Sequence, residues 1–267
     1  MAQDEVLYET DGSIAVVWLN RPGRANAATF EMAEQLRDCL ARAEADPSVR
    51  AVVLSGKGKA FCAGDDVEQA WGDERMAETM RELADVRPPL TPEARVMLDM
   101  RKPTIAAVNG AAVGIGMDFA LLCDLRIASE YAKFGQLFVK LGLMADVTGL
   151  WRLPQLVGLE KATELLLTGD VIDAAEAARI GLVSRVVPAE ELMPAALALA
   201  NRIAANPPLA VRHLKEGLRR AVGRSYGDLD ELGAFVGNGL ARLFATKDHR
   251  EAAAAFIEKR PAVFTGE

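Results

Sequence analysis

The sequence is poor in the residues on which several common kinds of site depend. It contains only two histidines, His213 and His249, and three cysteines in unrelated contexts. No CxxC or HxxxH spacing occurs, which argues against a zinc site. The odd number of cysteines argues against a disulfide framework. With so few histidines, a serine or cysteine nucleophile activated by histidine is not expected either.

Basic residues are also too few to favour nucleic acid. The chain has 31 Lys and Arg against 38 Asp and Glu, a formal net charge of −7, whereas phosphate backbones are bound by a basic face. The longest apolar stretch, residues 104–123, is interrupted by Asn109, Asp118 and glycines, so it predicts a buried strand, loop and helix rather than a membrane span. The N-terminus lacks the basic and apolar regions of a signal peptide. We therefore expect a cytoplasmic protein that binds neither membranes nor nucleic acid.

What is present is the pattern of an α/β protein of 267 residues. A chain of this length buries roughly three quarters of its unfolded surface and needs no disulfide or metal for its core. Short β-branched runs alternate with helical patterns, which favours parallel strands joined by right-handed crossovers. The predicted strands are residues 13–19, 49–55, 104–108 and 123–129, and the predicted helices are 30–45, capped by Thr29, and 117–122.

After Pro188 the strand signals stop and only helical spacing follows, over residues 190–205, 208–222, 229–245 and 247–260. We therefore divide the chain into a core, residues 1–200, and a C-terminal helical region, residues 201–267. Residues 67–91 are charge-rich and irregular. They indicate either a flap over a site or a solvated helical insertion.

Two turns rich in glycine and alanine each follow a predicted strand, GKGKAFCAGDD at 56–66 and NGAAVGIGMD at 109–118. Such turns expose backbone N–H groups, and the second leads into a helix N-terminus with its partial positive charge. Together they can direct one N–H each at a single oxygen, an arrangement that suits a thioester carbonyl becoming an enolate. Asp118 follows Ile115 by three residues, so its carboxylate should lie close to that oxygen. Asp118 could instead cap the helix N-terminus.

Five segments that span nearly the whole chain resemble the crotonase superfamily, the enoyl-CoA hydratase/isomerase family. They are LNRPGRANA (19–27), AFCAGDD (60–66), AVNGAAVGIGMDFALLCDLRIAS (107–129), LTGDVIDAAEAARIGLVSRVV (167–187) and FIEKRPAVF (256–264). The resemblance implies an α/β spiral of ββα units with a helical C-terminal trimerisation region. It also implies an acyl-CoA substrate, a homotrimer or dimer of trimers, and no cofactor beyond the coenzyme A of the substrate.

The resemblance further implies roles for individual residues. The oxyanion-hole N–H groups fall on Asp65 and Ile115, where the family usually has glycine in place of Ile115. The Ile115 side chain should narrow the acyl pocket. Coenzyme A contacts fall on Arg24, Ala25 and Ala63, and on Lys259, which in this family sometimes serves a neighbouring subunit.

The carboxylates depart from the hydratase pattern. Hydratases of the family use two glutamates, and this chain has Asp118 at the first position and Phe138 at the second. A further acid, Asp146, lies in GLMADVTGLWRLPQLVG, which looks closely like the corresponding stretch of dienoyl-CoA isomerases. An acid matching Asp146 is also the nucleophile of 4-chlorobenzoyl-CoA dehalogenase. Asp146 could equally be the N-cap of a helix that begins near Val147.

This set of residues favours a double-bond shift in an unsaturated acyl-CoA. We expect one carboxylate to be buried among Phe138, Met144 and Trp151, which would line the acyl pocket and raise its pKa. Asp146 would be the main proton carrier and Asp118 its helper. Trp151 could instead be a core residue.

Three other functions stay open. They are 2-enoyl-CoA hydration with altered acids, a hydrolase or dehalogenase reaction with Asp146 as nucleophile, and a non-catalytic CoA-binding or RNA-binding homologue.

Overall fold

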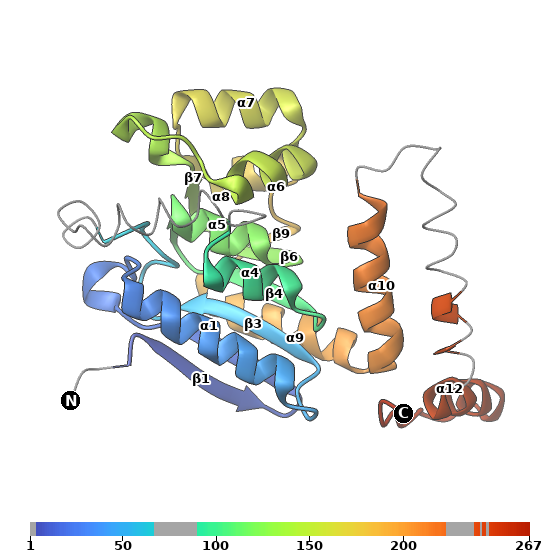
Figure 1. Cartoon of the computed structure of the whole chain (residues 1–267). Helices are drawn as coiled ribbons and strands as arrows, with labels where there is room; N and C mark the ends of the chain where they lie inside the picture. Colours follow the sequence, from blue (N-terminus) through green and yellow to red (C-terminus); the bar gives the residue numbers. More distant parts are fainter. Residues whose placement is uncertain (1–3, 67–89, 223–237, 241, 244–245) are drawn as a thin grey trace.

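The structure is a computed structural model, which describes residues 4–66, 90–222, 238–240, 242–243 and 246–267. Most of the irregular segment 67–91 and most of the helix predicted at 229–245 lie outside the described residues. The described part forms a layered α/β body, with the last helices set to one side of it (Figure 1).

One six-stranded sheet forms the centre, in the order β1-β2-β3-β4-β6-β9. β1 pairs with β2 antiparallel, and every other pair in this sheet is parallel. The strands are β1 Val6–Asp11, β2 Ile14–Leu19, β3 Ala51–Gly56, β4 Thr104–Val108, β6 Leu125–Ser129 and β9 Arg185–Val187. The four strands predicted from the sequence are confirmed to within two residues. β1 and β9 were missed because both are edge strands that are exposed along much of their length, so neither reads as an apolar run.

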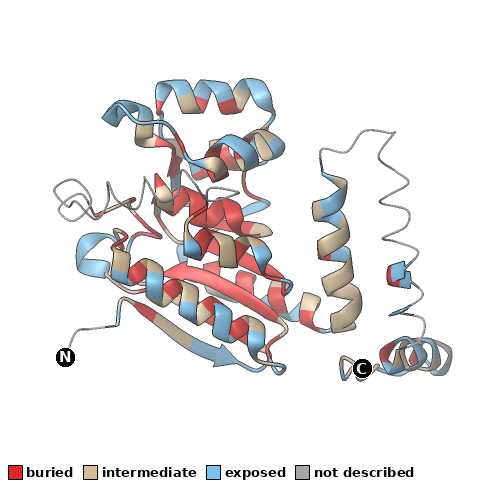
Figure 2. Cartoon of the chain, viewed as in Figure 1, coloured by how far each residue is buried: buried red, intermediate tan, exposed pale blue. Residues whose placement is uncertain are grey.

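Helices cover both faces of this sheet. α1 (Phe30–Ala45) and α4 (Pro92–Asp99) lie on one face, and Thr29 caps α1 by accepting from the Met32 N–H at 2.9 Å, as predicted. α9 (Leu192–Ala204) packs on the other face. Successive strand residues point to opposite faces, so β3 gives Val52 and Leu54 to the first core and Val53 to the second. Figure 2 shows this buried layer along β3 and the helix faces turned toward it.

A second, three-stranded sheet contains β5 Ala111–Val113, β7 Lys133–Gly135 and β8 Ile172–Asp173, in the order β5-β7-β8. The chain thus repeats a ββα unit. β4 and β5 lead into α5 (Ile115–Leu122), and β6 and β7 lead through the 3₁₀ helix η2 (Leu137–Leu141) into α6 (Val147–Val157). α7 (Leu159–Thr168) and α8 (Ala174–Arg179) follow. The predicted α/β spiral of ββα units is confirmed.

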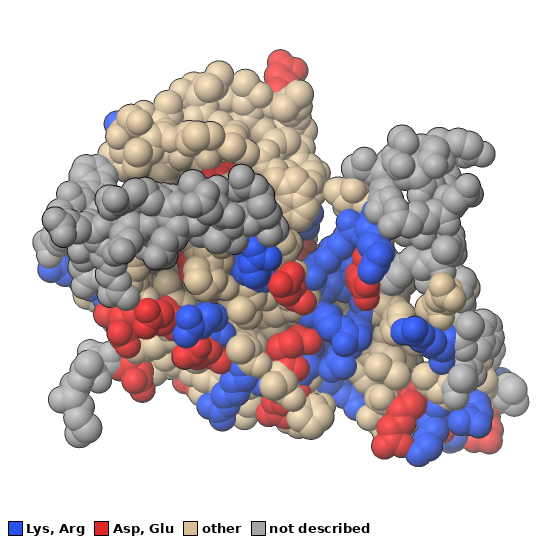
Figure 3. All heavy atoms as spheres, viewed as in Figure 1, with Lys and Arg blue, Asp and Glu red and all other residues tan. Residues whose placement is uncertain are grey.

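The C-terminal helices α10 (Pro208–Ala221) and α12 (Lys247–Glu258) stand beside the main body (Figure 1). Buried Lys215 of α10 donates to the Lys102 carbonyl at 2.7 Å and pairs with Asp124 at 2.5 Å. Figure 3 shows several basic side chains where α10 faces the body. The predicted division at residue 200 falls inside α9, so the two-part organisation stays a prediction. No helix in the described part of the chain has the length and apolar character that a bilayer crossing requires.

The fold leaves no room for a side chain at Gly116, the second residue of α5. A Cβ on Gly116 would lie 2.2 Å from the carbonyl oxygen of Cys62 and 2.7 Å from its Cβ. We therefore expect Gly116→Ala to push α5 away from residues 62–66 and to lower the free energy of unfolding by about 1–3 kcal/mol. Urea unfolding monitored by circular dichroism measures this. Gly23→Ala is the matched control, since its Cβ would have no neighbour within 4 Å. Equal unfolding midpoints for the two variants would contradict the prediction.

Candidate active site

The first turn, residues 62–66, pairs with Ala28 in a way that fixes the direction of one N–H group. Ala28 donates to the Gly64 carbonyl and accepts from the Asp66 N–H, both at 2.8 Å, which makes a parallel bridge between Ala28 and Asp65. In a parallel bridge, Ala28 forms its two backbone hydrogen bonds with the residues before and after Asp65, and not with Asp65 itself. The N–H of Asp65 therefore points away from Ala28.

The second turn carries another N–H group and lies against the first turn. Ile115 is the first residue of α5, so its N–H has no acceptor within the helix. The two turns are joined because Cys62 donates to the Ala111 carbonyl at 2.8 Å and accepts from the Val113 N–H at 3.1 Å. A Cβ on Gly114 would lie 3.7 Å from the Gly64 Cα, so the turns touch. This contact brings the predicted donors, Asp65 and Ile115, into adjoining turns.

Asp118 lies one helical turn beyond Ile115 and is only 2% exposed. Its Oδ1 accepts a hydrogen bond of 2.7 Å from Gln136 Nε2, and its Oδ2 is buried without a donor in the described part of the chain. Burial raises the pKa of Asp118 well above its ordinary value, the Asp146 charge raises it further, and Gln136 opposes the rise. Asp118 does not cap α5, where Gly114 holds the N-cap position, so that alternative is wrong.

Asp146 caps α6, as one of the two interpretations predicted. Its Oδ1 accepts from the backbone N–H groups of Thr148 at 2.7 Å and Gly149 at 3.2 Å. Desolvation by the surrounding protein raises the pKa of Asp146, and these two N–H groups and the nearby Asp118 carboxyl oppose the rise. Within the pair, burial favours the protonated form of Asp118, and the two N–H groups favour the charged form of Asp146. This is the arrangement that a proton-carrying carboxylate pair requires.

Two further acids lie near this pair. Burial raises the pKa of Asp65 and of Glu93, and the negative charge of Asp146 raises both further. Glu93 is 5% exposed in the first turn of α4, where it accepts from Thr91 Oγ1 at 2.5 Å. Sequence reasoning missed Glu93, since a glutamate in a first helical turn is ordinarily a surface residue. It also missed Gln136, which follows β7 and carries no distinguishing signal of its own.

The predicted pocket residues do not all lie together. The Phe138 ring adjoins the second turn, because its Cζ would be 3.7 Å from a Cβ on Gly114. Met144 is 75% exposed and Trp151 is 42% exposed. The expectation that these three residues bury a carboxylate is therefore wrong in the single chain, where Asp118 is buried although Met144 and Trp151 are exposed. That Phe138, Met144 and Trp151 line the acyl pocket stays a prediction.

The predicted coenzyme A contacts fall into two places. Arg24 is the last residue of the 3₁₀ helix η1 (Pro22–Arg24), and Ala25 follows it with a φ of +50°. Ala63 donates its N–H to the Ala25 carbonyl at 3.1 Å, so these three residues meet beside Asp65. Lys259 follows α12, on the opposite side of the molecule from η1 (Figure 1). A single chain does not bring Lys259 to the others, and its contact with coenzyme A from a neighbouring subunit stays a prediction.

Residues 9–267 match the family model described as "Enoyl-CoA hydratase/isomerase". The chain belongs to this family. The resemblance to the crotonase superfamily inferred from the sequence is thus confirmed, whereas the particular likeness of residues 142–158 to dienoyl-CoA isomerases stays a prediction.

Individual relatives within the enoyl-CoA hydratase/isomerase family agree in length. The chain is 38% identical over 265 residues to a crotonyl-CoA hydratase of Syntrophomonas wolfei, with 99% of each covered. It is 41% identical over 255 residues to a putative enoyl-CoA hydratase of Thermus thermophilus, covering 95% of this chain and 98% of that one. The crystal structure of an enoyl-CoA hydratase from Bacillus anthracis superposes with a TM-score of 0.90 at 32% identity, covering 98% of this chain and all of that one.

The elevated pKa of Asp118 predicts a pH dependence of stability. The folded chain keeps a proton on Asp118 at pH values where the unfolded chain, with a carboxyl pKa near 3.8, has lost it. The free energy of unfolding therefore falls as the pH rises above about 4, until the pH passes the raised pKa. We expect Asp118→Asn to weaken this fall. Denaturant unfolding at several pH values measures the slope.

Asp99→Asn is the control for that experiment, since Asp99 is an exposed carboxylate at the end of α4. A slope in Asp118→Asn as steep as in the unchanged protein would contradict the assignment of the proton to Asp118.

Proposed function

We propose that this protein shifts a double bond in an unsaturated acyl-CoA thioester through an enolate. The observation that carries the proposal is the pair of neighbouring acids Asp118 and Asp146, each with a raised pKa, beside the joined turns of Asp65 and Ile115. Two N–H donors stabilise negative charge on the thioester oxygen, and a carboxylate beside them can move a proton between carbons.

In the proposed reaction the Asp146 carboxylate removes a proton from the carbon next to the thioester carbonyl, or from the vinylogous carbon. The C–H electron pair moves toward the carbonyl, whose oxygen becomes the enolate oxygen held by the Asp65 and Ile115 N–H groups. The pair of acids then returns a proton to a different carbon, and the double bond re-forms at its new position. Asp118 assists as the second acid of the pair.

Hydration of a 2-enoyl-CoA is the second candidate, because the relatives compared here are named as hydratases. It requires a water molecule handled by two acids, and Asp118 and Asp146 are such a pair. Against it stands Phe138, whose ring lies beside the second turn and places an apolar surface there. A substitution in which Asp146 attacks the substrate is a third candidate, and it requires a covalent ester at Asp146.

The assembly and setting form part of the proposal. Large apolar side chains are exposed on α7 and α10, namely Leu159, Leu167, Leu214 and Leu218, which supports a homotrimer or a dimer of trimers. Arg24, Ala25 and Ala63 would bind coenzyme A, with Lys259 from a neighbouring subunit. The reaction needs no cofactor beyond that coenzyme A, and we propose a cytoplasmic location.

Asp146→Asn tests the role of the base. Asparagine is as good an N-cap as aspartate, so the variant keeps α6 while it loses the carboxylate. We expect kcat for isomerisation of a 3-enoyl-CoA or 3,5-dienoyl-CoA to fall by about 10²–10⁴-fold. Mass spectrometry of products formed in D₂O follows the reaction, with a 2-enoyl-CoA tested in parallel.

Each outcome of that assay decides between the candidates. Water addition by the unchanged protein, without a double-bond shift, would replace isomerisation by hydration. A substrate ester trapped at Asp146 by rapid quench would favour the nucleophilic reaction. No turnover and no deuterium uptake with any of these substrates would contradict isomerisation and hydration, and the nucleophilic reaction would then be tested with acyl-CoA substrates that carry a leaving group.

Phe138→Glu tests the reason for preferring isomerisation. It puts a carboxylate beside the second turn, where the Phe138 ring now lies. We expect the variant to add water to a 2-enoyl-CoA faster than the unchanged protein does, because the new acid replaces an apolar surface with a group that holds water. Phe138→Leu is the control for loss of the aromatic ring. An equal gain in both variants, or none in either, would contradict this explanation.

A further inference from the structure

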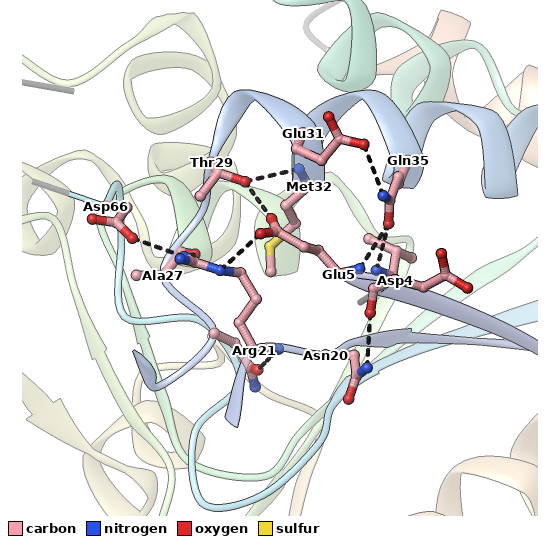
Figure 4. Close-up of polar contacts among 12 residues, drawn as sticks. Asp4, Glu5, Asn20, Arg21, Ala27, Thr29, Glu31, Met32, Gln35 and Asp66 are labelled. Carbon is pink, nitrogen blue, oxygen red and sulfur yellow. Dashed lines mark hydrogen bonds and ion pairs between the residues drawn. The ribbon is translucent and has the colours of Figure 1, made fainter. Parts of the chain in front are cut away.

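A buried ion pair lies directly behind the first turn of the site. Arg21 follows β2, and its Nη1 donates to Asp66 Oδ2 at 2.8 Å and to the Ala27 carbonyl at 2.6 Å. Its Nε lies 3.1 Å from Glu5 Oε1. The side chains of Arg21 and Asp66 are only 17% and 8% exposed. Figure 4 shows Arg21 between Glu5 on one side and Asp66 on the other.

Arg21 is itself held in place by its surroundings. Glu5 accepts a hydrogen bond from Thr29 Oγ1, and the Glu5 N–H is bound by Gln35 of α1 at 2.8 Å. The Arg21 N–H donates to Asn26 Oδ1 at 2.7 Å. The guanidinium is planar and its N–H donors have fixed directions. A guanidinium held in one position therefore also fixes the positions of Asp66 and the Ala27 carbonyl, which it binds.

The groups that Arg21 binds lie on the two sides of the bridge that directs the Asp65 N–H. Ala27 precedes Ala28, and Asp66 follows Asp65. The bridge itself consists of two hydrogen bonds of 2.8 Å. The Arg21 contacts to Asp66 and to the Ala27 carbonyl thus add side-chain restraints to the three backbone hydrogen bonds that join residues 63–66 to residues 25–28.

We propose that Arg21 is a positioning residue for the reaction, and that its pair with Asp66 fixes the direction in which the Asp65 N–H meets the thioester oxygen. Arg21 does not touch the reacting atoms. It acts through Asp66 and the Ala27 peptide on the neighbouring peptide of Asp65. The inference rests on the proposed use of the Asp65 N–H as a thioester donor, but not on which of the candidate reactions follows.

A role in holding coenzyme A is the competing explanation, because Arg24 and Ala25 belong to the same loop. The two roles differ in their kinetic effect. Loss of coenzyme A contacts weakens binding and raises KM, whereas loss of an oxyanion donor's alignment lowers kcat, since that donor stabilises the transition state more than the bound substrate. A displacement of about 1 Å in such a group costs roughly a hundredfold in rate.

The test compares Arg21→Met, Arg21→Lys and Asp66→Asn with Arg179→Met, an exposed arginine of α8 paired with Glu176. Circular dichroism and thermal unfolding identify the variants that fold. Isotope-edited infrared spectroscopy then measures the C=O stretch of bound butyryl-CoA labelled with ¹³C at the thioester carbonyl. This saturated ligand reports polarisation by the two N–H groups without any turnover.

We expect Arg21→Met and Asp66→Asn to lower kcat by about ten- to a hundredfold, with KM changed less than about threefold. The bound carbonyl frequency should move back toward its value in solution. Arg21→Lys keeps the positive charge but lacks the planar guanidinium, so its kcat and carbonyl frequency should lie between those of Arg21→Met and the unchanged protein. Arg179→Met should match the unchanged protein. If Arg21→Met does not fold, the nearly isosteric Asp66→Asn decides the matter.

A raised KM with unchanged kcat and carbonyl frequency would overturn the proposal in favour of coenzyme A binding. Unchanged kcat, KM and carbonyl frequency in Asp66→Asn would overturn the proposal outright. If the unchanged protein itself leaves the bound carbonyl at its solution frequency, the proposed oxyanion hole fails, which separates that failure from the failure of the Arg21 inference.

Discussion

The site depends on the contact between two turns from different repeats of the spiral. Neither the Asp65 N–H nor the Ile115 N–H is unusual by itself, and each becomes useful only when both meet one oxygen. The Cys62–Ala112 bridge joins the two turns, and Gly116 lets α5 approach Cys62 more closely than any side chain would permit. Backbone donors held in this way need no reorganisation when negative charge develops, which is the condition for strong stabilisation of an enolate.

The acids complete this arrangement by dividing their roles according to environment. Asp118 is enclosed by α5 and Gln136, and burial favours its protonated form. Asp146 meets the N–H groups at the start of α6, which favour its charged form. Position alone thus separates two aspartates of equal intrinsic acidity, as the proposed division into an acid and a base requires. The Arg21–Asp66 pair lies outside this division and acts on the donor side of the site.

The sequence predicted the parts of the structure that depend on local pattern. Thr29 as a cap and β4 over residues 104–108 follow from short-range rules, and the joined turns follow from the family motifs. It failed where the outcome depends on distant partners. β5, β7 and β8 are two or three residues long and exist only through pairing across repeats. The burial of Glu93 and the exposure of Met144 depend on which helices pack together, which periodicity does not encode.

The central claim is that the paired N–H groups and the Asp118–Asp146 pair together make an enolate. Its most direct test is exchange of the α-protons of butyryl-CoA in D₂O, followed by mass spectrometry and NMR. This substrate has no double bond to move or hydrate, so exchange reports proton removal next to the thioester and nothing else. The account predicts stereospecific uptake of one deuterium at the α-carbon, much faster than in protein-free buffer. Binding of butyryl-CoA without any such uptake would contradict it.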